Sequence, residues 1–200
     1  MNRKLFFIII LLLNCELLTA QPNKLDSLTT AYKKNKQDST FVKLLIEKAK
    51  RYRGINPDSG MICLRNGLIL SRRIGYKYGE TGSLNIISLY YFDEGDLAES
   101  MKIAFQLLPK AQAINDQESK WGSYAVLGLD YYMLQDYQKS FTYLRKALNV
   151  ADQYRLYYYR GIANYNLAYC YIQLGRVDSA DYFNRQFIKL SKYADKSFFT

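Results

Sequence analysis

The chain has 200 residues, of which 28 are Lys or Arg and 18 are Asp or Glu, and its formal net charge is +10. It contains no His, which excludes Ser-His-Asp and Cys-His catalysis and any metal site that needs an imidazole ligand. The basic residues are scattered rather than gathered in one patch. The charge therefore predicts a solvated basic surface and no nucleic-acid partner.

The first twenty residues have the pattern of a signal peptide. Arg3 and Lys4 precede the apolar run 5–13, and Leu18-Thr19-Ala20 offers small residues before a cleavage point. Residues 1–20 are therefore predicted to direct export to the periplasm or cell envelope. Two alternatives stay open: a buried hydrophobic helix, and a lipoprotein signal with Cys15 acylated. No long apolar run follows Gln21, so the mature chain is predicted to have no membrane span.

The remainder divides into an N-terminal segment, 21–38, with a short helix near 24–34, and a repeat domain, 39–200. Within that domain the chain matches itself at a spacing of 40 residues. Equivalent positions are small, apolar or aromatic in every copy, as in the columns Ser88/Gly128/Ala168, Ser100/Ser140/Ala180, Ile87/Leu127/Leu167 and Tyr91/Tyr131/Tyr171. A fourth, degenerate copy upstream keeps Gly60 and Leu68. We expect eight helices in four antiparallel pairs, with the small columns at close helix crossings.

Turn signals separate the two helices of each pair. They are Asn56-Pro57-Asp58, Glu94-Gly95-Asp96, Gln135-Asp136 and Leu174-Gly175-Arg176. Asp93, Glu94 and Asp96 could be paired catalytic carboxylates. Their place at a turn instead favours capping of the next helix. No other catalytic pattern occurs in the sequence, so we predict a protein that is not an enzyme and needs no cofactor.

The columns resemble the tetratricopeptide (TPR) repeat family. Leu127-Gly128, Tyr131, Tyr137, Ser140, Leu144 and Ala147 carry the resemblance best, and it covers roughly residues 39–191. The period of 40 exceeds the usual ~34 residues of that family and is similar to its long-repeat type. The resemblance implies an all-α fold, a right-handed superhelical α-solenoid of antiparallel helix pairs.

The resemblance also implies a binding surface formed by the first helix of each pair. The side chains expected on it lie outside the packing columns and are Asn85, Leu89, Phe92, Leu129, Tyr132, Met133, Tyr165, Tyr169 and Ile172. This surface, called the inner surface below, lacks the basic residues with which some TPR domains clamp a peptide carboxylate. The predicted partner is therefore a protein or peptide with apolar anchors. The alternative is that some of these side chains pack against a neighbouring helix.

Two further features leave alternatives open. Tyr154, Tyr157, Tyr158 and Tyr159 could stack on bases or sugars, although packing near a helix junction is favoured. Cys63 and Cys170 are expected to stay unpaired, because three repeats separate them.

The N-terminal part resembles the exported TPR region of Bacteroidetes signalling proteins. Leu25-Asp26-Ser27-Leu28, Asn56-Pro57-Asp58-Ser59 and Ile74-Gly75-Tyr76-Lys77 carry this second resemblance. It implies a sensor or adaptor module of a signalling system. The alternative is a structural component of an envelope assembly that forms homo-oligomers through the last helix pair.

Overall fold

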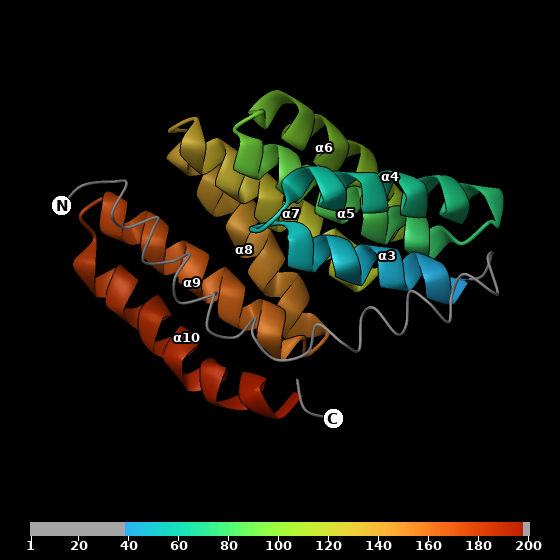
Figure 1. The fold of residues 1–200 in the computed structure, drawn as a ribbon. Coiled ribbons are helices and arrows are strands. Elements are labelled where there is room, and N and C mark those ends of the chain that lie inside the picture. The colour runs from blue at the N-terminus through green and yellow to red at the C-terminus, as the bar shows by residue number, and fades with distance from the viewer. Residues whose placement is uncertain (1–38, 198–200) are drawn as a thin grey trace. The chain divides into compact units, whose positions relative to one another are not determined.

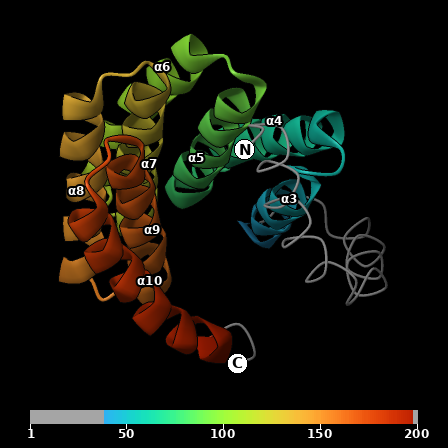
Figure 2. The ribbon, with the colours of Figure 1, turned by 90° about the vertical axis from the view of Figure 1, so that its left-hand side faces the viewer.

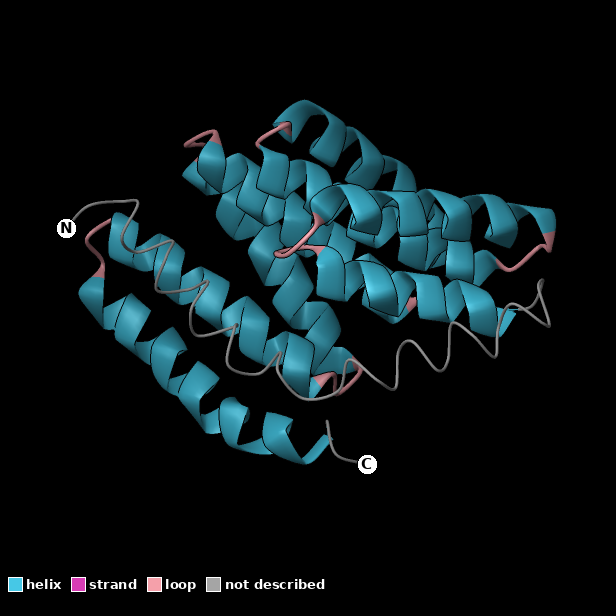
Figure 3. Ribbon diagram, in the orientation of Figure 1, coloured by secondary structure: helices cyan, strands magenta, loops and turns pink. Residues whose placement is uncertain are grey.

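The computed structural model describes residues 39–197, and this part of the chain is helical with short connecting loops and no strand (Figure 3). It contains eight helices, which confirms the number predicted from the 40-residue register. The proposed signal peptide, Cys15 and the short helix expected near 24–34 lie outside the described residues. The chain divides into two compact units. The boundary between them along the sequence falls between Gly79 and Glu80, inside the first turn of a helix.

The described part of the first unit is one helical hairpin. Helix α3 (Ser39–Tyr52) packs against α4 (Pro57–Arg73), as Figure 1 shows. Asn56 precedes α4, and its side-chain oxygen accepts the Ser59 N–H at 3.0 Å. Val42 of α3 and Leu64 of α4 are fully buried. The turn predicted at Asn56-Pro57-Asp58 is thus confirmed as a capped helix start.

The second unit contains most of α5 (Lys77–Glu94) and five further helices. These are α6 (Leu97–Ala113), α7 (Gln117–Met133), α8 (Tyr137–Gln153), α9 (Tyr157–Gln173) and α10 (Val177–Ser197). From α6 to α10 each helix packs against the next, and Figures 1 and 2 show α9 and α10 running antiparallel, side by side. The fold class predicted from the sequence, an all-α solenoid of helix pairs, is confirmed.

One turn geometry recurs every 20 residues and sets the spacing of the helices. A residue with positive φ ends each helix from α4 to α9, at Gly75, Gly95, Asn115, Gln135, Arg155 and Gly175. The N–H of that residue bonds the carbonyl three positions back, and the next N–H bonds the carbonyl five back, as in the Gly95–Phe92 and Asp96–Tyr91 pairs. The chain therefore reverses in the same way at each of these turns.

The small columns are buried where helices cross. Ser88, Ser100 and Ser140 are fully buried, and Gly128 is buried too. A Cβ atom on Gly128 would lie 2.6 Å from Leu144 Cδ2, which is closer than real Cβ contacts. Glycine at this position therefore allows α7 to approach α8, as the sequence predicts.

Candidate binding surface

The predicted inner-surface residues of α5 take part in helix packing. Leu89 is half-buried and packs against the buried cluster of Ala104, Val126 and Leu127. The amide of Asn85 lies directly over Gly122 of α7 and leaves no room there for a Cβ. Both side chains thus follow the alternative that the sequence left open. Phe92, on the same helix, is half-buried.

An aromatic cluster joins α7 to α9. The rings of Tyr132 and Tyr169 lie 5.4 Å apart, and Tyr137 of α8 packs edge-on against Tyr132 at 5.8 Å. Burial, and next a hydrogen bond with Tyr169, raises the pKa of the Tyr132 hydroxyl above its ordinary value. Tyr132 also packs against the buried cluster of Leu144, Leu167 and Cys170. Two of the predicted residues are therefore brought together, in a cluster that also holds the repeats together.

Three of the predicted residues are exposed. Ile172 is 58% exposed, Met133 53% and Tyr165 39%. The ring of Tyr165 packs against Phe187 of α10 at 5.5 Å. Leu129, the remaining residue of the predicted set, is half-buried on α7. The accessible apolar part of the inner surface therefore consists mainly of Met133, Tyr165 and Ile172.

The tyrosines at the α8–α9 turn divide into two groups. Tyr159 packs against Trp121 with a ring distance of 4.6 Å and donates a hydrogen bond to Glu118. Tyr154, Tyr157 and Tyr158 are exposed instead. The packing favoured from the sequence therefore holds for Tyr159. The ring of Tyr158 packs edge-on against that of Tyr159 at 5.4 Å although its side chain is exposed.

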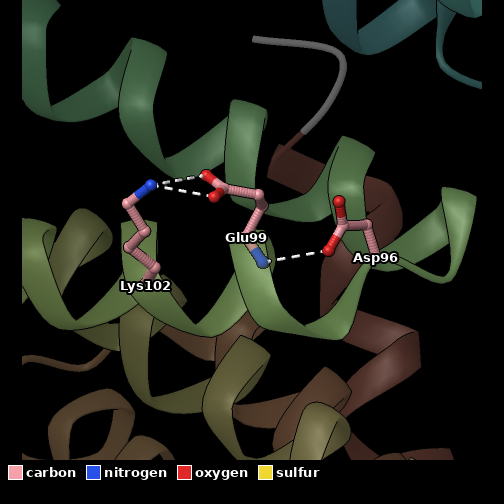
Figure 4. Close-up of polar contacts among 3 residues, drawn as sticks. All are labelled: Asp96, Glu99 and Lys102. Carbon is pink, nitrogen blue, oxygen red and sulfur yellow. Dashed lines mark hydrogen bonds and ion pairs between the residues drawn. The ribbon is translucent and has the colours of Figure 1, made fainter.

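Helix capping accounts for Asp96, one of the three carboxylates considered as a catalytic group. Its Oδ1 accepts the Glu99 N–H at 3.1 Å, and the Glu99 carboxylate in turn pairs with Lys102 at 2.8 Å (Figure 4). Asp116 and Asp136 cap α7 and α8 in the same way. The capping interpretation is confirmed for Asp96.

A buried acid that the sequence reasoning missed lies between α6 and α7. Asp130 is fully buried, and its Oδ2 accepts a hydrogen bond from the Ser100 hydroxyl at 2.9 Å. No described group donates to its Oδ1. Burial, opposed by the Ser100 hydrogen bond, raises the pKa of Asp130 to about 7. The sequence did contain a signal for this buried acid. Asp130 is equivalent to Tyr90 one repeat earlier and to Cys170 one repeat later, and both of these residues are buried.

The next repeat has a neutral counterpart of this pair. Ser140 and Cys170 lie 3.7 Å apart, each 40 residues after Ser100 and Asp130. Burial, opposed by the Ser140 contact, raises the pKa of the Cys170 thiol to about 11, so the thiol is protonated at neutral pH. Cys63 and Cys170 are both free, as predicted.

Neither a metal site nor a membrane-spanning helix occurs in the part of the chain that the structure describes. Between 39 and 197, no three His, Cys, Asp or Glu side chains come together in a group that could hold a metal ion. No described helix combines the length and the apolar character needed to cross a membrane.

Comparison with known proteins identifies the fold. No protein-family model matches the chain, and no curated protein matches its sequence. Among solved structures, aspartyl phosphate phosphatase F from Bacillus subtilis is similar with a TM-score of 0.67 and 13% identity, over 77% of this chain and 41% of that one. A signal transduction ATPase with a tetratricopeptide repeat sensor from Pyrococcus horikoshii gives 0.64 and 18%, over 94% of this chain and 30% of that one.

A third similar structure consists of TPR-like repeats. It is a putative kinesin light chain from Podosopora anserina, with a TM-score of 0.56 and 14% identity over 86% of this chain and 85% of that one. The chain spans less than half the length of the first two proteins. At these identities the likeness concerns the fold, and it agrees with the TPR-like repeat expected from the sequence.

Proposed function

We propose that the chain is a non-catalytic scaffold that binds a protein or peptide, and that it serves as an exported sensor or adaptor module of a signalling system. The observation that carries the proposal is the set of exposed apolar side chains on the first helices of two successive pairs. Met133 of α7 and Tyr165 and Ile172 of α9 lie outside the packing columns and remain accessible. An amphipathic helix or extended peptide with apolar anchors suits them.

The fold and the sequence supply the rest of the support. A tetratricopeptide repeat forms the sensor of the Pyrococcus ATPase, and the signal-peptide pattern of residues 1–20 favours an envelope location. Because the exposed side chains are uncharged, binding is expected to depend only weakly on salt.

Affinity capture from an envelope extract tests this proposal. The wild-type chain is compared with an Ile172→Ser variant and with an Ile62→Ser control, since Ile172 and Ile62 are both 58% exposed and Ile62 lies on α4. A partner recovered by wild type and control but lost from Ile172→Ser supports the inner surface. The partner is then purified, and its dissociation constant is measured at two salt concentrations. Equal recovery by all three proteins would show that this surface is not the site.

A second candidate function is assembly through the last helix pair. Val177, Tyr182 and Ile188 of α10 are 72%, 59% and 49% exposed. An envelope component that forms homo-oligomers could use these side chains. Light scattering across a concentration series, with a Tyr182→Ser/Ile188→Ser variant, decides between the two: a dimer lost in the variant favours assembly, and a monomer at all concentrations rejects it.

A further inference from the structure

A cavity on the side of α8 combines aromatic walls with two arginines. It has a volume of about 330 Å³ and lies where α8 meets the end of α9 and the turn before α10. Tyr137, Phe141 and Tyr171 form its aromatic part, and Arg145 and Arg176 are its charged residues. No acidic side chain lines it. Its size lies at the lower end of the range for ligand sites and suits one or two side chains of a peptide.

Tyr171, the buried part of the aromatic wall, is held in place by two ring contacts and a hydrogen bond. Tyr171 is 7% exposed, and its ring stacks on that of Phe183 with an interplanar angle of 7°. The ring of Phe141 also packs against Tyr171, with 4.5 Å between the ring centroids. Arg145 Nη2 donates a hydrogen bond to the Tyr171 hydroxyl at 3.1 Å. The hydroxyl oxygen accepts this bond, so its own hydrogen can be donated to a ligand. Arg145 is thus held at the cavity by a residue that cannot easily move.

Neither arginine is neutralised. Among the described residues, no carboxylate pairs with the Arg145 or the Arg176 guanidinium. Asp178 is the nearest acid along the chain, and it does not line the cavity. Two unpaired guanidinium groups that line one cavity repel each other, and an anion bound there reduces that repulsion and can accept their hydrogen bonds.

The equivalent place one repeat earlier has a different charge. There Asp136 stands where Arg176 stands here, and Asp136 pairs with Lys139 at 2.8 Å while Lys139 covers the ring of Tyr131 at 5.0 Å. Phe105 takes the place of Arg145. The earlier junction therefore carries an acid and a base that neutralise each other. The residues that line the later cavity include two arginines and no acid.

We propose that this cavity binds an acidic peptide, with a glutamate or aspartate carboxylate between Arg145 and Arg176 and an adjacent apolar side chain against the aromatic wall. The cavity lining does not include Met133, Tyr165 or Ile172, the exposed side chains that carry the proposed function. The cavity could therefore bind its peptide whether or not those side chains bind a partner. The chain's excess of basic over acidic residues, 28 to 18, adds a long-range attraction for such a partner.

Fluorescence anisotropy with the full chain tests the proposal. The probe is a labelled hexapeptide with two glutamates flanking a phenylalanine, and its control is the same peptide with glutamines. We expect the glutamine peptide to bind about tenfold more weakly, because it loses the charge-assisted hydrogen bonds. Arg145→Gln should weaken binding of the glutamate peptide by a similar factor. Arg65→Gln, which removes one exposed charge on α4, should leave the affinity unchanged.

Arg176→Asp separates loss of the site from loss of the fold. This change places before α10 the same residue type that caps α8, where Asp136 is the N-cap. The start of α10 therefore gains a cap, and the cavity gains an acid. The variant should melt no lower than wild type and should not bind the glutamate peptide. Equal affinity for the two peptides, retained binding by Arg176→Asp, or displacement of the peptide by inorganic phosphate at an equal concentration would each overturn the proposal.

Discussion

The buried carboxyl of Asp130 makes the stability of this chain depend on pH in an unusual direction. Folding takes the side chain from water to a site where it is 0% exposed, with one hydrogen bond from Ser100 and no described donor to Oδ1. No charged group contributes to the pKa of about 7; burial raises it and Ser100 opposes the rise. The charged form of Asp130 is therefore disfavoured in the folded chain.

The sign and size of the effect follow from proton linkage. The pKa of Asp130 is about 7 in the folded chain and ordinarily 3.8. Between these two pH values the folded chain therefore binds more protons than the unfolded chain. The free energy of unfolding therefore falls as pH rises from about 4 to about 7, and Asp130 adds no further change above that. At about 1.4 kcal/mol for each pKa unit, the loss is up to about 4 kcal/mol. This is a large part of the total stability of a typical domain, about 5–15 kcal/mol.

Asp130→Asn isolates this contribution. The amide has nearly the same shape, keeps an oxygen for the Ser100 hydroxyl and never ionises. We expect wild type and variant to be about equally stable at pH 4.5. At pH 8 the variant should be more stable, by up to about 4 kcal/mol.

Urea denaturation followed by circular dichroism at the two pH values measures the difference. Asp178→Asn is the matched control, because it makes the same substitution at an exposed position, on α10. If the gap between wild type and Asp130→Asn is the same at pH 4.5 and pH 8, the carboxyl is not titrating between these values and the reasoning fails.

Three other substitutions have definite expected outcomes. Gly128→Leu should lower the free energy of unfolding by roughly 1–3 kcal/mol, since even a Cβ there meets Leu144 at 2.6 Å; an unchanged melting temperature would contradict the close crossing. Ser100→Ala removes the only described donor to the Asp130 carboxyl, so the pKa of Asp130 should rise further and stability at pH 8 should drop by about 1–3 kcal/mol, both read from urea curves across pH. Arg176→Asp should raise the urea midpoint by an amount equivalent to about 0.5–2 kcal/mol, and a lower midpoint would show that the start of α10 cannot use a cap.

The fold could be predicted because its determinants are local and repeat along the chain. The 40-residue columns mark which side chains are buried, and Ser88 and Ser140 are fully buried as expected. Gly95 and Gly175 mark two of the turns. Arg155 adopts the same positive φ without any turn signal in the sequence, because the 20-residue spacing of the helices imposes the reversal there.

The candidate surface was harder to predict, because exposure depends on what a neighbouring helix places opposite each side chain. Asn85 and Met133 look alike as positions outside the packing columns. Asn85 lies over Gly122, a residue 37 positions later whose lack of a side chain makes the space, while Met133 remains 53% exposed. A column shows that a position is equivalent from copy to copy. It does not show which residue of the next helix covers it.

The places where equivalent residues differ in charge carry information that the shared columns cannot carry. Shared columns are explained by packing, since every copy needs the same helix crossing. The series Tyr90, Asp130, Cys170 is not explained in this way, because all three positions are buried and the acid in the middle costs stability above neutral pH. The change from Asp136 to Arg176 is similar: it removes a cap and places an unpaired charge beside an aromatic cavity. In both cases one repeat carries a residue that is less favourable for packing or capping than the residue at the equivalent position of another repeat. We expect function to differ between the repeats at such positions.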